Sequence, residues 1–132
     1  MYIDFTNAWC AGLFEGEGNI HLSTQYDLMV TVVNTQRELL EPFLAFGGVI
    51  TARGKPEGQH RQVYQWRIGG ADMVKEFITK LQPFLVSKKY KSKFTYALEF
   101  IDFTKAQPKF LMNRDMRTYE LFRTKVNKGL LT

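Results

Sequence analysis

The sequence predicts an α+β fold in which helices cover one face of an antiparallel sheet. The hydrophobic period changes along the chain in the order helix, two strands, helix, two strands, helices. Each pair of predicted strands is joined by a turn or loop, which is typical of antiparallel hairpins. With 132 residues, 45% of them hydrophobic, the chain is long enough for one domain over residues 1–132 and too short for two.

The first predicted element is a helix over about residues 5–17, for which Asp4 and Thr6 are both candidate N-caps. Its apolar and small residues at helical spacing are Phe5, Trp9, Gly12, Leu13 and Gly16. From residue 19 the pattern alternates, and after a turn at Tyr26 and Asp27 the β-branched residues of 28–34 predict the partner strand. One side of the first strand carries Ile20, Leu22 and Thr24, and the other carries Asn19, His21, Ser23 and Gln25.

The hydrophobic period also predicts the later helices and strands. A second helix is expected over residues 35–46, kinked or irregular at Pro42, with Leu39, Leu40, Phe43 and Leu44 on its apolar face. Residues 49–53 and 62–68 predict a second hairpin, in which Tyr64, Trp66 and Ile68 alternate with Gln65 and Arg67. Helices are expected at 71–85 and 91–106, and a short one within 116–131. The inward residues of the first two are Met73, Val74, Phe77, Ile78 and Leu81, then Phe94, Ala97, Leu98 and Ile101.

The second face of this sheet is expected to be polar, with few acids. Its residues are Asn19, His21, Ser23, Gln25, Thr31, Arg53, Gln65 and Arg67, with Arg61 nearby. An ordinary solvated face is one interpretation, because antiparallel sheets often have one. A nucleic-acid surface is the other, because strands enter the DNA major groove and such side chains read base edges there. The formal charge of +5 and the pI near 9.4 favour a polyanionic partner.

Composition excludes several other classes of protein. Cys10 is the only cysteine, so no internal disulfide is possible, and a reducing intracellular compartment fits. No apolar run approaches the length of a membrane span, and the first residues lack the layout of a signal or transit peptide. A soluble protein with no membrane partner is therefore expected.

The stretch CAGLFEGEG, residues 10–18, places two acids at the end of the first helix, where the macrodipole disfavours negative charge. Gly12 and Gly16 stand on one helical face, so a second backbone can approach closely there. If two copies of the helix cross at these glycines, two Glu17 carboxylates meet, and Mg²⁺ resolves their repulsion. In the alternative interpretation Gly12 packs on its own sheet, and Gly16 and Gly18 merely end the helix.

These residues resemble the LAGLIDADG motif of homing endonucleases, with Cys10 for the first Leu, Phe14 for Ile, and Glu15 and Glu17 for the two aspartates. The resemblance extends to VVNTQRELL (32–40), FGGVI (46–50) and LQPFLVSKKYKS (81–92), and to the αββαββα order. It implies that family's fold, a saddle-shaped antiparallel sheet with helices on one face. Glu at position 17 is one methylene longer than the family's Asp.

The resemblance also implies roles for individual residues. Glu17 would bind the catalytic Mg²⁺ or Mn²⁺ together with the carbonyl of Gly16, and Glu15 would be structural or peripheral. Lys88 would stabilise charge on the phosphate or organise water. Asn34 would orient the attacking water, with Arg37 in the same network. A single motif copy implies a homodimer whose interface holds Trp9, Gly12, Leu13 and Gly16.

Two functions follow from this resemblance. The first is a site-specific homing endonuclease that makes a metal-dependent double-strand cut in a long pseudo-palindromic DNA target. The second is an intron maturase, or a regulator that binds DNA or RNA, on the same scaffold without nuclease activity. The acid at position 17 favours the first, whereas the basic charge fits both.

Overall fold

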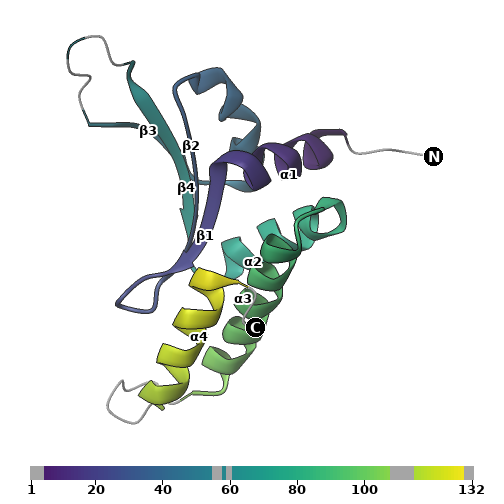
Figure 1. The fold of residues 1–132 in the computed structure, drawn as a ribbon, viewed down its shortest axis with the longest axis vertical. Helices are drawn as coiled ribbons and strands as arrows, with labels where there is room; N and C mark the ends of the chain where they lie inside the picture. The colour runs from purple at the N-terminus through teal and green to yellow at the C-terminus, as the bar shows by residue number, and fades with distance from the viewer. Residues whose placement is uncertain (1–4, 55–57, 59–60, 108–114, 130–132) are drawn as a thin grey trace.

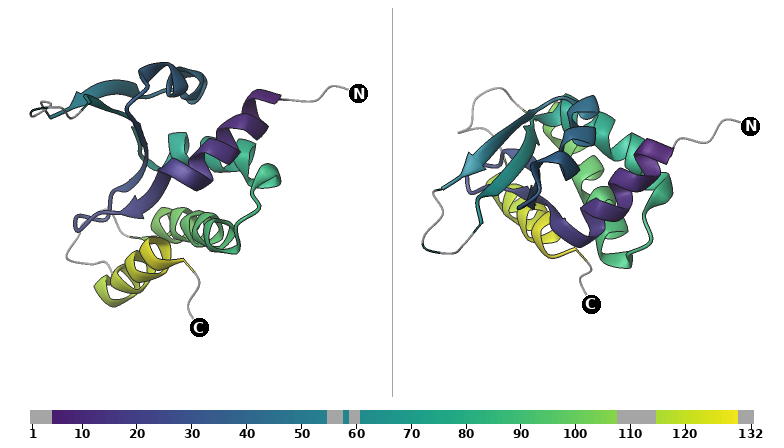
Figure 2. Two further views of the ribbon diagram at one scale, coloured as in Figure 1. Left: turned by 45° about the horizontal axis from the view of Figure 1, so that its top comes forward. Right: turned by 90° about the horizontal axis from the view of Figure 1, so that it is seen from above.

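A four-stranded antiparallel sheet of order β1-β2-β4-β3 organises the chain. The computed structural model describes residues 5–54, 58, 61–107 and 115–129. The strands are β1 (Gly18–Leu22), β2 (Leu28–Asn34), β3 (Val49–Arg53) and β4 (Val63–Gly69). The helices are α1 (Phe5–Glu17), α2 (Ala71–Leu81), α3 (Lys88–Lys105) and α4 (Met116–Lys128). They lie to one side of the sheet, with α4 beside α3 and β1, which confirms the predicted α+β class (Figures 1 and 2).

The sheet has one apolar and one polar face because successive side chains alternate. Val30 of β2 lies between Ile20 of β1 and Ile68 of β4, and all three are buried. Trp66 lies opposite Val32 in the same apolar layer and is fully buried. The face expected to pack on the helices is therefore the one that does.

Aromatic rings fill the space between the sheet and the helices. The ring of Phe77 on α2 lies 5.1–6.1 Å, between centroids, from those of Phe14, Phe46, Trp66 and Phe94. Such tilted and edge-on pairs add to the stabilisation that burial already provides. A second cluster joins α3 to α4 and consists of Phe100, Phe103, Tyr119 and Phe122.

The ends of three helices refine the expected boundaries. α1 begins at Phe5, so Thr6 lies inside the helix and the other candidate cap, Asp4, falls outside the described residues. α2 stops at Leu81, and the 3₁₀ turn η3 (Gln82–Phe84) replaces its expected last turn, because proline cannot continue a helix. α3 begins at Lys88, earlier than expected, because the hydroxyl of Ser87 accepts the N–H of Tyr90 at 3.4 Å.

The helix expected over residues 35–46 is irregular, as Pro42 indicated, but it is 3₁₀ instead of α-helical. Two 3₁₀ segments occupy this region, η1 (Arg37–Leu39) and η2 (Glu41–Phe46), with Pro42 at the start of the second. Three residues per turn bring every third side chain to the same side. The buried residues are accordingly Leu40, Phe43 and Phe46. Leu44, expected to point inward, is exposed, as is Met73 on α2.

Gly18 makes the passage from α1 into β1 possible. A Cβ at this position would lie 2.2 Å from Cδ2 of Phe14 and 2.8 Å from the Phe14 carbonyl oxygen. Phe14 is fully buried and packs edge-on against Phe77 and Tyr90, so it has little room to move. Gly18 is therefore a requirement of the fold of a single chain.

We expect Gly18→Ala to lower the free energy of unfolding by about 1–3 kcal/mol, because the added methyl group overpacks the Phe14 site. Chemical denaturation of the variant and the wild type measures the change. Gly69→Ala is the matched control, since its Cβ would meet only ordinary contacts at 3.7 Å or more. Equal stability of Gly18→Ala and the wild type would contradict this account of the α1–β1 junction.

Candidate nucleic-acid interface and metal site

The polar face of the sheet brings together side chains from all four strands. The register aligns Asn19, Thr31 and Arg67 side by side in one row, and Gln65 with Thr51 in the next. Arg53 lies at the end of β3 opposite Val63, and Arg61 is exposed just before β4. The helices of the described chain leave this face open (Figures 1 and 2). The structure thus places most of the expected polar residues on one accessible surface.

Ser23 and Gln25 are not on this face, so the expected extension of the strand through Gln25 is wrong. β1 ends at Leu22, and the hydroxyl of Ser23 accepts the N–H groups of Gln25 (3.2 Å) and Asp27 (3.0 Å). Serine favours such local bonds to the backbone over continuing a strand. Both residues lie in the tight turn at the tip of the first hairpin, where Gln25 is exposed.

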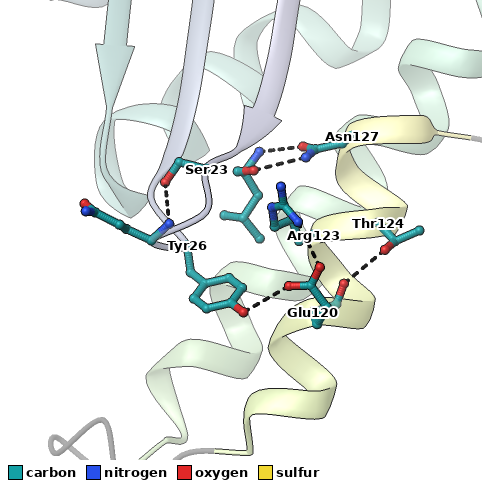
Figure 3. A network of polar contacts seen from close by, with 8 residues as sticks. Ser23, Tyr26, Glu120, Arg123, Thr124 and Asn127 are labelled. Atoms are coloured by element: carbon teal, nitrogen blue, oxygen red, sulfur yellow. Dashed lines mark hydrogen bonds and ion pairs between the residues drawn. The ribbon is translucent and has the colours of Figure 1, made fainter.

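α4 holds this hairpin at the free edge of β1 (Figure 3). The side-chain amide of Asn127 accepts the N–H of Leu22 at 2.7 Å and donates to the Leu22 carbonyl at 3.1 Å. These two bonds satisfy the strand edge as a neighbouring strand would. Beyond it, the carboxylate of Glu120 accepts the Tyr26 hydroxyl at 3.0 Å and pairs with Arg123 at 2.8 Å. The position of the hairpin tip therefore depends on α4.

His21 lies on the polar face beside Met29 but is half-buried. Its Nδ1 is buried and has no hydrogen-bond partner within the described part of the chain. Burial, and secondarily the nearby charge of Lys93, lower the pKa of His21 below its ordinary value. Both effects favour the neutral imidazole, which has one donor and one acceptor nitrogen.

Glu15 is placed where its charge is compensated. Its carboxylate accepts the backbone N–H groups of Val86 (2.8 Å) and Ser87 (2.5 Å), directly before α3. The N-terminal end of a helix favours negative charge, which offsets the unfavourable position of Glu15 at the end of α1. Glu15 therefore has a structural contact, which joins the last turn of α1 to the start of α3. The same contacts hold Lys88, the next residue after Ser87, close to the end of α1.

Glu17 differs from Glu15 in having no such partner. It is exposed, and its carboxylate makes no hydrogen bond or ion pair with any described residue. It lines an open hollow of about 370 Å³ together with Val33, Asn34, Thr35 and Val63. The structure therefore brings Asn34 and Glu17 to one place, as the resemblance implied.

The other two predicted catalytic residues lie outside the lining of this hollow. The guanidinium of Arg37 pairs with Glu41 at 3.1 Å, and both side chains are largely exposed. Lys88 is exposed at the first position of α3. Asn34 itself is partly engaged, because its side-chain oxygen accepts the N–H of Gln36 at 2.9 Å, which leaves the amide as a donor.

The residues at the end of α1 fit a hard divalent cation only in part. Glu17 supplies a carboxylate oxygen, and the last turn of a helix supplies carbonyl groups without intrahelical partners, including that of Gly16. Among the residues that the structure describes, no three His, Cys, Asp or Glu side chains gather at one point. One chain thus offers an incomplete set of oxygen ligands at this point.

The outer face of α1 is open and partly apolar. Apart from its chain neighbours and the backbone of its own helix, a Cβ at Gly12 or Gly16 would meet no described atom within 4 Å, so the alternative in which Gly12 packs on its own sheet is wrong. On the same face Phe5 is 75% exposed and Trp9 is 43% exposed. Phe5, Thr6, Trp9 and Pro42 border a shallow apolar hollow. The core-facing residues of the helix are instead Cys10, Ala11 and Phe14.

Some residues of the site were not expected from the sequence. Thr51 and Val49 share the polar face with Arg53, and the alternation of residues 49–53 contains the signal that indicates them. Lys93 is buried at 2% exposure and donates to Asn19, at the edge of the polar face. A lysine within a helix is normally expected to be solvated, so no sequence signal indicates this position.

No protein-family model matches the sequence, and no curated protein matches it significantly. Solved structures do match. The homing endonuclease I-CvuI in complex with its target has a TM-score of 0.66 and 22% identity, over 92% of this chain and 80% of that chain. The LAGLIDADG meganuclease I-AabMI bound to uncleaved DNA has a TM-score of 0.73 and 21% identity, over 98% and 47%. The homing endonuclease I-TnaI has a TM-score of 0.71 and 14% identity, over 98% and 92%.

At these identities the similarity establishes the fold, which is that of the LAGLIDADG homing endonucleases. The resemblance drawn from residues 10–18 is confirmed at this level. The chain spans about half the length of I-AabMI and most of the length of I-TnaI. In addition, none of the helices described is long and apolar enough to cross a membrane.

We expect Asn127→Ala to cost about 1–3 kcal/mol of stability and to loosen the first hairpin, because two backbone groups of Leu22 lose their partner. Amide hydrogen exchange over residues 22–28 measures the loosening, and thermal unfolding measures the cost. Thr124→Ala is the matched control, since that hydroxyl only bonds to the Glu120 carbonyl within α4. Unchanged exchange in Asn127→Ala would show that α4 does not hold the hairpin.

Proposed function

We propose that this chain, with the fold of LAGLIDADG homing endonucleases, is a site-specific DNA endonuclease that cuts both strands of a long pseudo-palindromic target with a divalent metal. The observation that carries the proposal is the exposed carboxylate of Glu17, located where α1 meets the open polar face of the sheet. The neighbouring acid, Glu15, bonds to the start of α3, whereas Glu17 bonds to none of the residues that the structure describes. An unpaired carboxylate beside a polar, basic surface suits metal-dependent phosphodiester hydrolysis.

The polar face is proposed to read DNA. Its rows combine Arg67 with Thr31 and Asn19, and Gln65 with Thr51, which are residue types that bond to base edges and phosphates. The net charge of +5 adds attraction to the phosphate backbone. I-CvuI and I-AabMI, which share the fold, were solved in complex with DNA.

The proposed metal, Mg²⁺ or Mn²⁺, would be held by Glu17 and the carbonyl of Gly16. When bound, it would supply positive charge to the phosphate oxygens and lower the pKa of bound water. Lys88 would add positive charge at the phosphate. The free amide of Asn34, beside Glu17 in the same hollow, would donate to the attacking water and orient it. Arg37 would join this network from η1.

The active species is proposed to be a homodimer formed through the outer face of α1. Gly12 and Gly16 leave room for a second backbone, and no contact within the described chain requires a glycine at either position. Trp9 and Leu13 would supply apolar contact area beside them. The dimer would bring two Glu17 carboxylates together and so complete the ligand set that one chain lacks.

A cleavage selection on a randomised DNA library tests this function. With Mg²⁺ we expect cut ends that converge on one long pseudo-palindromic site, and no cutting with EDTA. Glu17→Gln should abolish cutting and leave DNA binding within about threefold, because a neutral amide is a poor ligand for a hard cation. Glu99→Gln on the exposed side of α3 is the matched control and should cut normally. Cutting by Glu17→Gln at the wild-type rate would refute the metal assignment, whereas binding of DNA or intron RNA without cutting would favour the maturase or regulator.

We expect Arg67→Ala to weaken binding of the selected site about tenfold or more, because arginine pairs on base edges contribute about 1–3 kcal/mol each. Sequencing of bound DNA should show relaxed preference at one base pair of each half-site. Arg117→Ala, which removes an exposed arginine of α4, controls for the loss of general charge. An unchanged sequence profile together with a uniform loss of affinity would assign Arg67 to a phosphate instead.

A further inference from the structure

Lys93 is the one buried charged residue among the side chains that the structure describes. Its Nζ donates to Oδ1 of Asn19 at 2.8 Å and lies 5.5 Å from the ring centroid of Tyr90. Its aliphatic stem lies beneath Gly129, where an added Cβ would come within 3.1 Å of the Lys93 Cγ. Burial, reinforced by the charge of Lys89, lowers the pKa of Lys93 to about 8. Burying a charged group costs free energy, so Lys93 is an unexpected residue for the core of this fold.

The partner of Lys93 suggests an explanation for its presence there. Asn19 is two residues beyond Glu17, and Gly18 lies between them. The carbonyl of Gly18 accepts the hydroxyl of Tyr90, also on α3, at 2.8 Å. Tyr90 and Lys93 are three positions apart on one face of that helix, so both reach the same short stretch of β1.

Glu15, two residues before Glu17, is also bonded to the segment that begins α3. It accepts the N–H groups of Val86 and Ser87 at the start of α3. The two residues after Glu17 and the residue two positions before it are thus all bonded to residues 86–93. The side chain of Glu17 bonds to none of the described residues, while the backbone that carries it is fixed on both sides.

From this arrangement we propose that Lys93 and Tyr90 are positioning residues that fix the carboxylate of Glu17 for metal binding, acting through Asn19 and Gly18. The inference rests on the proposed function and adds to it two residues that the site hollow does not contain. Neither residue needs to touch DNA or metal for this role. The role also accounts for the presence of a buried cation at this position.

Lys93→Met tests the proposal, because methionine keeps the stem and removes the charge and the donor. At saturating DNA we expect cleavage to slow about 10–100-fold, the usual effect of losing a group that orients a metal ligand. The Mg²⁺ concentration for half-maximal cleavage should rise, while DNA affinity in EDTA stays within about twofold. The melting temperature should be unchanged or higher, since an apolar residue replaces a buried charge. Tyr90→Phe, which removes only the hydroxyl, should shift the metal dependence in the same direction.

Lys105→Met is the matched control, because it removes an exposed lysine from the last turn of the same helix and should cleave normally. Wild-type cleavage and metal dependence in Lys93→Met would overturn the positioning role and leave the endonuclease proposal standing. If the wild type itself cuts no DNA, the endonuclease proposal fails instead. Amide hydrogen exchange of residues 17–21 then decides the inference separately: faster exchange in Lys93→Met supports it, and unchanged exchange overturns it.

Discussion

The ring of Phe14 packs where α1, α2, α3 and the start of β1 come together. This ring is fully buried among the rings of Phe77, Tyr90 and Phe94, so it fixes α1 against α2 and α3 at once. It also excludes any side chain at Gly18, where the chain turns into the edge strand. Because α1 and β1 meet directly, the placement of one hydrophobic ring sets both the helix axis and the start of the sheet. The packing of this ring therefore also sets the positions of Glu15 and Glu17.

The two acids in the last turn of α1, Glu15 and Glu17, differ in their contacts. Both are disfavoured by the macrodipole of α1. Glu15 is compensated, because the beginning of α3 offers it two backbone N–H groups. Glu17, two residues later, points to another side of the helix and stays exposed without such a partner among the described residues. The fold therefore compensates the charge of Glu15 and leaves that of Glu17 uncompensated by the described residues, as the proposed role of Glu17 in binding a cation requires.

Much of the fold was predictable because hydrophobic period reports burial. The alternation of Tyr64, Trp66 and Ile68 predicted the core face of β4, and the helical spacing of residues 5–17 predicted α1 with its end at Glu17. The period failed where backbone chemistry overrides it. Pro42 converts a helical pattern into 3₁₀ turns, which moves Leu44 outward and Phe46 inward.

The sequence predicted the acids of the candidate site and most of its polar face. It did not predict the residues that hold these elements in place. Glu17 of the motif and Asn34 of the later segment VVNTQRELL line one hollow. The contacts of Lys93 with Asn19 and of Asn127 with Leu22 join positions 74 and 105 residues apart. No local pattern encodes contacts at that separation, and both residue types usually face solvent. The prediction for Ser23 was wrong for a local reason, because its hydroxyl accepts backbone N–H groups of the turn.

The described chain has two open surfaces, which meet at the junction of α1 and β1, where the proposed metal site lies. The outer stripe of α1, with Trp9 and Gly12, runs toward the end of the helix, and the polar face of the sheet begins at Asn19. Since β1 follows α1 without a linker, the two surfaces share only the short stretch around Glu17. A partner helix on the first surface and a nucleic acid on the second would therefore meet there. In the proposed dimer, a second chain, a metal and a phosphate would therefore act together at the junction that Phe14 fixes.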